Sequence, residues 1–148
     1  MSNIIDDKDQ KILEVLQDHA EYTTSQIAKK TLLPRTTIHN HIKKLRKDKI
    51  IKKYTVELDQ SKLEHDFVAY ILITVNLELL KLKKKTQYDL VRELRSLHFV
   101  ERADIVSGGT DIVAIIRVKD VHEFDKVLLG RLQLVEGIEK TQSLIVIH

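Results

Sequence analysis

The first 50 residues carry hydrophobic side chains at the spacing of three short amphipathic helices. Each helix is expected to begin at a capping residue or at the single proline: Asp6 or Asp7, Thr23 or Thr24, and Pro34. The inward-facing side chains of the three helices would be Ile12, Leu13, Val15 and Leu16, then Ile27 and Ala28, then Ile38, Ile42 and Leu45. The short turn between the second and third helices predicts a helix-turn-helix.

The chain after the third helix is expected to fold back and then extend. Ile50 and Ile51 would pack against the helices, and the alternating residues 54–58 predict a strand. Three helices and a terminal strand make a winged helix-turn-helix domain over residues 1–58. The polar residues 59–66 predict a linker to the rest of the chain.

The second half of the sequence alternates between strand and helix patterns. Strands are expected at 67–77, 100–107, 111–118 and 137–147, with helices at 86–97 and from Asp120 onward. This order, β-α-β-β-α-β, predicts a ferredoxin-like domain over residues 67–148 and an α+β fold class for the whole chain. Helices cover only one face of such a sheet, so we expect a second copy to cover the other face in a homodimer or a larger ring.

Charge is concentrated on the helix-turn-helix. The whole chain has a net charge of +3, but residues 29–53 hold ten Lys or Arg against one acidic residue, Asp48, which gives this segment +9. Such a concentration is typical of a surface that binds phosphates, although a charge run alone is also typical of a solvated face. Together with the motif, it makes double-stranded DNA the expected partner.

The third helix carries the candidate DNA-binding side chains. Those in its first turns could contact base edges, with Asn suited to adenine and Arg to guanine: Arg35, Thr36, Thr37, His39 and Asn40. Lysines on and after the helix would meet phosphates and add affinity without specificity: Lys43, Lys44, Lys52 and Lys53.

Several classes of protein and site are not expected. No apolar run approaches the roughly 20 residues that span a bilayer, and the first ten residues lack the pattern of a signal peptide, so we expect a cytoplasmic protein that does not bind membranes. The chain has no cysteine, and His39 and His41 are two positions apart on a helix, which is a poor spacing for a metal pair. We therefore expect no metal, no cofactor and no catalytic residues.

Three stretches of the sequence resemble the Lrp/AsnC family of transcriptional regulators, also called the leucine-responsive or feast/famine family. IDDKDQKILEVLQDHAEYTTSQIAKKTLLPRTTIHNHIKKLRKDKIIKKYTVELD follows the family's helix-turn-helix, VSGGTDIVAIIRV follows its glycine-bearing loop, and EFDKVLLGRLQLVEGIEKTQSLIVI follows its closing helix and strand. The resemblance implies sheet-paired dimers, commonly four to an octameric ring, and an amino-acid effector bound between dimers near the loop. The effector residues would be Gly108, Gly109, Thr110 and Asp111.

The sequence departs from the family pattern at two places. The family loop usually reads Gly-Asp-aromatic-Asp, whereas residues 108–111 read Gly-Gly-Thr-Asp, which leaves Asp111 to answer an effector's ammonium group and the N–H groups of the glycine turn to receive a carboxylate. The family often has Ser before the proline, whereas this chain has Leu33, so either Thr31 replaces the cap or Leu33 packs over the turn.

Two other functions fit parts of the sequence. The charge would suit an architectural protein that wraps DNA with little sequence preference, and the basic residues 81–85 could then touch DNA or form a solvated lead-in to a helix. Proteins that resemble this family's fold act as sirohaem decarboxylases, for which His98 and His122 would be candidate residues.

Overall fold

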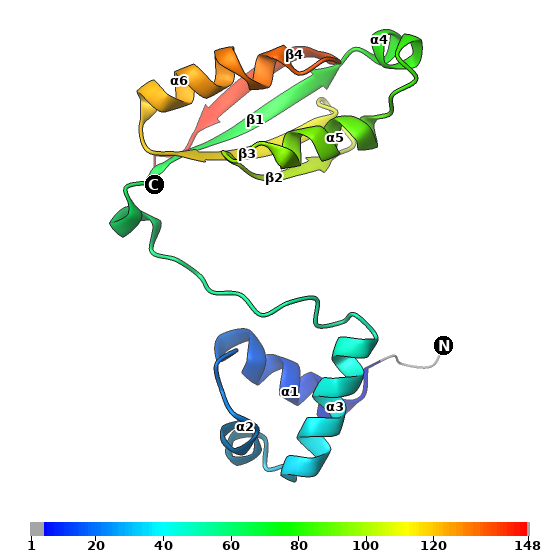
Figure 1. The fold of residues 1–148 in the computed structure, drawn as a ribbon, viewed down its shortest axis with the longest axis vertical. Helices are drawn as coiled ribbons and strands as arrows, with labels where there is room; N and C mark the ends of the chain where they lie inside the picture. The colour runs from blue at the N-terminus through cyan, green and yellow to red at the C-terminus, as the bar shows by residue number, and fades with distance from the viewer. Residues whose placement is uncertain (1–4, 148) are drawn as a thin grey trace. The chain divides into compact units, whose positions relative to one another are not determined.

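The computed structural model describes residues 5–147 of the 148-residue chain. The chain divides into two compact units, Met1–Leu58 and Asp59–His148 (Figure 1). Each unit has a hydrophobic core of its own. None of the helices within residues 5–147 combines the length and apolar character that a membrane-crossing helix requires.

The amino-terminal unit contains the three expected helices, α1 (Asp7–Asp18), α2 (Thr24–Thr31) and α3 (Arg35–Lys47). Capping boxes begin α1 at Asp6 and α2 at Thr23, because in each the side chain of the cap and that of the residue three positions later bond each other's backbone N–H. The apolar stripes meet in one core built on Ile12, Leu16, Ile27 and Ile38. The three predicted helices are confirmed, and so are their inward faces except for Leu13, which is half-buried and does not belong to this core.

The turn between α2 and α3 is held by packing rather than by a side-chain cap. Pro34 occupies the N-cap position of α3, and no side chain bonds to the first turn. Leu33 packs on the core that contains Ile38, which is the arrangement of a hydrophobic staple. The Thr31 hydroxyl instead donates to the carbonyl of Ile27 in its own helix, at 2.8 Å. Of the two alternatives for this turn, the packing of Leu33 is therefore the correct one.

Residues 52–59 have no regular secondary structure, so the strand predicted at 54–58 is absent from the described chain. A strand needs a hydrogen-bonding partner, and the sheet of the structure pairs only strands of the second unit. Residues 59–66, expected to be a linker, include a 3₁₀ turn, Gln60–Leu63, and are bonded to the second unit. Glu64 forms an ion pair with Lys119 at 3.1 Å, and Arg117 donates to the carbonyl of His65 at 3.3 Å.

The second unit is a four-stranded antiparallel sheet with helices on one face. Its elements are β1 (Phe67–Val75), α4 (Leu77–Leu82), α5 (Gln87–Ser96), β2 (Val100–Ile105), β3 (Ile112–Val118), α6 (Val121–Gly130), a 3₁₀ turn (Leu132–Leu134) and β4 (Ile138–Ile145). The strand order is β2-β3-β1-β4, as in a ferredoxin-like fold (Figure 1). The predicted α+β fold class is confirmed.

Alternate residues of the strands separate a covered face from an open one. In β1 and β3 the residues buried beneath α5 and α6 include Ile71, Ile73, Ile112 and Ile116. The residues between them belong to the other face, over which no helix of the second unit packs within the described residues. We call this the open face; it includes Tyr70, Leu72, Val113 and Ile115 from β1 and β3, and Lys140, Gln142 and Leu144 from β4.

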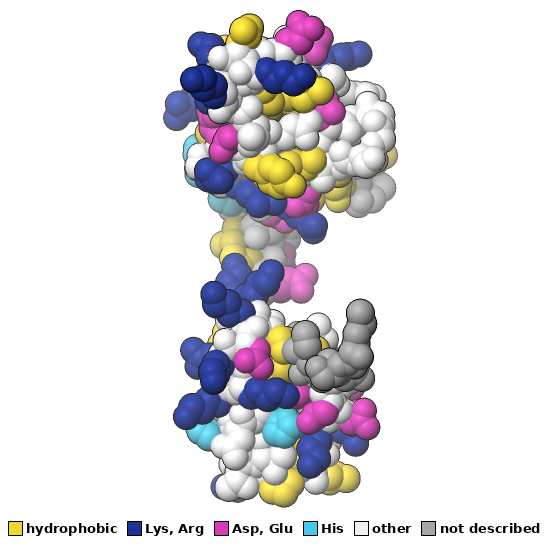
Figure 2. All heavy atoms as spheres, turned by 90° about the vertical axis from the view of Figure 1, so that its right-hand side faces the viewer, with side chains coloured by type: hydrophobic (Ala, Val, Ile, Leu, Met, Phe, Trp, Pro, Cys, Tyr) yellow, Lys and Arg dark blue, Asp and Glu magenta, His cyan; other side chains and the backbone are white. Residues whose placement is uncertain are grey.

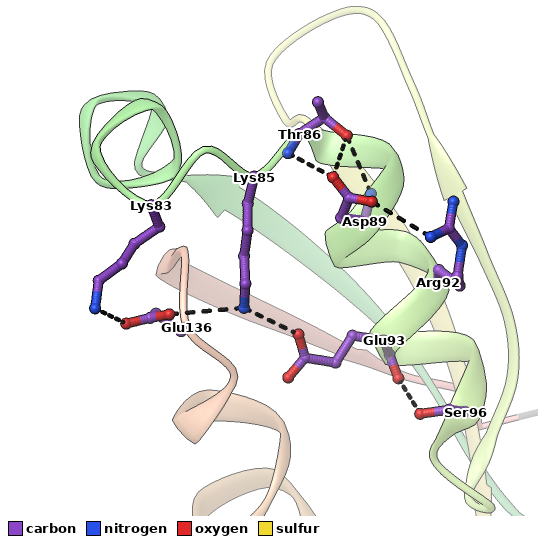
Figure 3. A network of polar contacts seen from close by, with 8 residues as sticks. All are labelled: Lys83, Lys85, Thr86, Asp89, Arg92, Glu93, Ser96 and Glu136. Atoms are coloured by element: carbon purple, nitrogen blue, oxygen red, sulfur yellow. Dashed lines mark hydrogen bonds and ion pairs between the residues drawn. The ribbon is translucent and has the colours of Figure 1, made fainter.

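The basic residues 81–85 lie at the end of α4, a helix that the sequence did not predict. Glu136 holds two of these lysines, with its carboxylate 3.0 Å from the Lys83 ammonium and 3.6 Å from the Lys85 ammonium (Figure 3). Lys85 also lies 3.6 Å from Glu93 of α5. The hydrogen bond from Lys83 and the charge of both lysines lower the pKa of Glu136. Lys83 and Lys85 therefore join α4 to α5 and to the chain before β4.

Gly137 is expected to be intolerant of a side chain, unlike Gly130. Gly137 has φ +106°, and an added Cβ would lie 2.6 Å from Cδ2 of the buried Leu80. Gly137→Ala should lower the free energy of unfolding by about 2 kcal/mol, measured by urea denaturation. Gly130→Ala is the matched control, because its Cβ would meet no atom within 4 Å at the end of α6, and it should be neutral or slightly stabilising. Equal effects of the two substitutions would contradict this assignment.

Candidate DNA interface and effector site

The outward face of α3 is polar and basic. Thr36, Asn40 and Lys43 recur at the spacing of one helix face, opposite the buried Ile38 and Leu45, and all three are exposed. An Asn side chain can bond adenine in two places, and Thr and Lys can reach other base edges or phosphates. The structure therefore brings three of the predicted DNA-binding residues together on one solvent-facing surface.

Four other predicted residues lie on the flanks of α3. Arg35 and His39 share the side toward α2, where His39 borders a groove of about 280 Å³ together with Thr24. Thr37 and Lys44 share the side toward α1, where Lys44 is bonded to that helix. Flanking side chains reach the walls of a DNA groove more readily than its floor, so these residues are suited to phosphate and peripheral contacts.

The electrostatic surroundings of α3 favour anions. Lys52 and Lys53 are exposed in the segment that follows the helix, and Lys and Arg side chains cover much of the face of this unit drawn in Figure 2. The first turn of α3 has no side-chain cap, in contrast to α1 and α2. Its backbone N–H groups and the positive end of its dipole therefore add to the attraction for phosphate.

A buried acid that the sequence did not single out ties α3 to α1. Asp9 is fully buried; its Oδ1 lies 2.7 Å from Nδ1 of His41, and its Oδ2 lies 3.1 Å from the ammonium of Lys44. An ionised carboxylate only accepts hydrogen bonds, so His41 is the donor. Asp6 completes the group, because it is the capping partner of Asp9. Asp9 thus accepts hydrogen bonds from three donors and ties α3 to α1.

The contacts of Asp9 also set its charge state. Burial raises the pKa of a carboxyl, but the hydrogen bonds from His41, the backbone of Asp6 and Lys44, with the positive charge of Lys44, outweigh it and hold the pKa of Asp9 below its ordinary value. In return, the hydrogen bond to Asp9 raises the pKa of Lys44. Lys44 was predicted to meet phosphate, yet its ammonium is already engaged inside the unit.

Asp6, Asp9 and His41 have ligand atoms within 4.8 Å of one another, the only such group within residues 5–147. Their arrangement is that of a hydrogen-bonded cluster, since His41 and Asp9 are bonded to each other and Lys44 brings a positive charge to the same carboxylate. A metal ion would have to displace these bonds and tolerate the lysine. The cluster is better suited to its structural role.

The glycine loop between β2 and β3 is fastened to β1 by two of the predicted effector residues. The Asp111 carboxylate accepts the Val75 N–H at 2.8 Å, and the Thr110 hydroxyl donates to the Ile73 carbonyl at 2.8 Å. Gly108 and Gly109 are exposed, and Gly108 has φ +147°, which only glycine readily adopts. Asp111 was predicted to pair with an ammonium group; in the structure one oxygen of its carboxylate accepts the Val75 N–H.

A pocket of about 330 Å³ lies beside this loop on the open face. Two of the four predicted effector residues, Gly109 and Thr110, line it, and Gly108 and Asp111 do not. The sequence missed the other lining residues, which come from β1 and β4: Leu72, Thr74, Lys140 and Gln142. Strand pairing brings these together, since Thr74 pairs with Lys140 and Leu72 with Gln142.

The two histidines considered for an enzymatic function lie on one groove. His98 and His122 border a hollow of about 540 Å³ along α6, with Lys119, Lys126 and Arg131 and with the acids Asp120 and Glu123. Asp120 caps α6, and Glu123 bonds the backbone of Lys119. Both acidic side chains thus already accept backbone N–H groups at the start of α6.

Comparison with known proteins agrees with the two units. A protein-family model described as winged helix-turn-helix DNA-binding matches residues 5–52, and one described as the Lrp/AsnC ligand binding domain matches residues 68–148. The HTH-type transcriptional regulator FL11 of Pyrococcus furiosus is 32% identical over 147 residues, which cover 99% of this chain and 92% of that protein. FL11 of Pyrococcus horikoshii is 29% identical over 143 residues, 97% of this chain and 89% of that protein.

Solved structures share the fold. The transcriptional regulator NMB0573 of Neisseria meningitidis, in complex with L-Met, superimposes with a TM-score of 0.86 at 22% identity, over 97% of this chain and 90% of that one. AsnC of Escherichia coli gives a TM-score of 0.84 at 24% identity, over 97% and 93% of the two chains. From its helix-turn-helix, its sheet topology and these matches, the chain belongs to the Lrp/AsnC family of transcriptional regulators, with a DNA-binding unit and a ligand-binding unit.

Proposed function

We propose that this protein binds a specific site on double-stranded DNA as a homodimer, with the outward face of α3 in the major groove. The observation that carries the proposal is the alignment of Thr36, Asn40 and Lys43 on one exposed face that contains no acid. A dimer would present two such helices about 34 Å apart, one turn of DNA, so its site would be a palindrome.

The test compares one base-reading and one phosphate-binding variant. Asn40→Ala should lower the ratio of specific to non-specific affinity about 10-fold and leave the salt dependence unchanged, because it removes a hydrogen bond to a base. Lys43→Ala should weaken both kinds of binding and lower the salt slope by about one for each phosphate that the lysine neutralises. DNA from upstream of the protein's own gene and a scrambled duplex would be titrated across a salt series.

Lys126→Ala is the control, because this exposed lysine lies in the second unit and should leave both affinities unchanged. Lys44→Ala is less suitable for the phosphate test, since it would also leave Asp9 short of a partner. An unchanged specificity ratio in Asn40→Ala would remove Asn40 from the interface. Equal affinity of the wild-type protein for both duplexes would favour the architectural, DNA-wrapping function instead.

The homodimer is proposed to form through the open face. Ile115, Tyr70 and Leu144 are neighbours in register across β3, β1 and β4. Tyr70 and Leu144 are 42% and 47% exposed, so two adjacent large side chains of the open face lie in solvent. A second copy would offer the same surface and bury both, as a two-fold interface requires. An octamer of four dimers is the larger assembly expected for the family.

A small-molecule effector is proposed to bind in the pocket beside the glycine loop and to change DNA affinity. The pocket has a volume suited to a ligand of a few heavy atoms, and Gly109 leaves backbone accessible within it. The match to a ligand-binding domain supports this position. An effector that favours one arrangement of the dimer would alter the spacing of the two α3 helices and thus the affinity for DNA in the cytoplasm.

A further inference from the structure

We propose that the pocket beside the glycine loop selects a small carboxylate that has no amino group, such as a 2-oxo acid, over the corresponding α-amino acid. The inference rests on the proposed function, in which a small effector binds in this pocket. It concerns the chemical class of that effector. Three features of the pocket carry it: its charge, the engagement of Asp111 and the character of its remaining walls.

Lys140 is the charged residue of the pocket. No carboxylate lines it, and Lys140 forms no ion pair with any residue within 5–147. Lys140 pairs with Thr74 across β4 and β1, which fixes its backbone at the loop end of the open face. An ammonium group at this position attracts a ligand carboxylate and repels a ligand ammonium. Lys140 would therefore attract the carboxylate of a zwitterionic amino acid and repel its ammonium group.

Asp111 is not among the residues that line the pocket, and one oxygen of its carboxylate is engaged by the sheet. One carboxylate oxygen accepts the Val75 N–H at 2.8 Å, and the backbone N–H of Asp111 donates to Ile73 at 3.0 Å. These bonds fix Asp111 in the sheet beside a strand irregularity between Thr74 and Val75, outside the residues that line the pocket. Releasing the carboxylate would leave the backbone N–H of Val75 unsatisfied, at a cost of about 1–3 kcal/mol.

The other walls suit a neutral polar group and an apolar tail. Gln142 and Thr74 offer uncharged donors, which can bond a keto oxygen, and Leu72 offers an apolar surface. Gly109 has open space around it, and its N–H has no acceptor within residues 5–147, so a ligand carboxylate can approach that backbone. A 2-oxo acid could pair its carboxylate with Lys140, bond its keto oxygen to the neutral donors and pack its tail on Leu72. It would need no acidic side chain in the pocket.

The experiment measures binding of matched pairs to the full-length protein by isothermal titration calorimetry. The pairs are 4-methyl-2-oxopentanoate with leucine, and 4-methylthio-2-oxobutanoate with methionine, which differ only at the second carbon. At least one oxo acid should bind 10-fold or more tightly than its partner amino acid. Lys140→Gln should remove most of that binding, whereas Lys126→Gln, an exposed lysine on α6, should not. Far-UV circular dichroism checks that each variant is folded.

Two outcomes would overturn the inference in distinguishable ways. An amino acid that binds as tightly as its oxo acid, with or without Lys140, would contradict the selectivity and leave the effector pocket of the proposed function intact. Failure of every member of both pairs to bind, in protein that still binds its DNA specifically, would remove both the selectivity and the effector. A charge-reversed variant, Lys140→Glu, gives an independent check, because it should reverse the preference toward the amino acids.

Discussion

Aspartate in place of Ile115 is expected to leave the protein monomeric. Ile115 lies at the centre of the open face, paired with Tyr70 on β1, and a second copy would bury it. A carboxylate there would be desolvated without a partner, which should weaken the dimer by at least about 3 kcal/mol, or roughly 100-fold in its dissociation constant. Sedimentation velocity over a concentration series measures the change directly.

The DNA affinity of this variant should fall with the loss of the dimer, because one recognition helix then binds without the other. Leu129→Asp is the matched control: Leu129 is 54% exposed, but it lies on α6 rather than on the open face, so its variant should remain dimeric. A dimer that survives Ile115→Asp would place the subunit interface on another surface. Binding of the monomer to half-site DNA would show that the α3 surface itself remained intact.

Asn in place of Asp9 is expected to loosen the amino-terminal unit more than any other isosteric change in it. The substitution removes the charge that His41 and Lys44 share and puts an amide in a fully buried position. We expect a loss of about 3 kcal/mol in the stability of this unit. Hydrogen exchange, followed by mass spectrometry in peptides from α1 and α3, isolates the effect from the second unit. Asp7→Asn is the control, since Asp7 is exposed in the same turn, and it should change stability by less than about 0.5 kcal/mol.

The effect of Asp9→Asn should also depend on pH. Because the pKa of Asp9 is lowered in the folded state, its contribution is present above the ordinary carboxyl range, near pH 4, and is lost as the pH falls through the lowered value. The wild-type unit and the variant should therefore differ fully at pH 7 and converge at strongly acidic pH. A difference that did not shrink at any acidic pH at which the unit remains folded would mean that Asp9 acts through shape rather than through charge.

The regular elements of both units could be predicted because their signals are local. Apolar side chains at helical spacing mark α1, α3 and α5, and β-branched runs mark β1 and β3. α4 was missed because its six residues are too short to establish a period. The strand expected at 54–58 failed for the opposite reason: the local pattern was suitable, but a strand forms only where another strand pairs with it.

The candidate sites also differ in how far local sequence could predict them. The residues of α3 could be named from the sequence, because a helix places residues three and four positions apart on one face, and the structure separates that face from its flanks. The pocket could be named only in part. Gly109 and Thr110 are adjacent in sequence, but Lys140 and Gln142 reach them through the pairing of β4 with β1. Neighbours across a sheet depend on register, which no short stretch of sequence contains.

By itself, the sequence determined a basic helix-turn-helix followed by a ferredoxin-like unit, since helix periods, caps and charge are properties of neighbouring residues. Only the tertiary structure decided which charged groups are available. In the sequence, nothing distinguishes Lys44 and Asp111 from charged residues that are free to bind a ligand. In the structure, Lys44 is bonded to the buried Asp9, and Asp111 to the backbone of β1. Their partners lie 35 and 36 positions away in the chain, so no short stretch of sequence reveals these bonds.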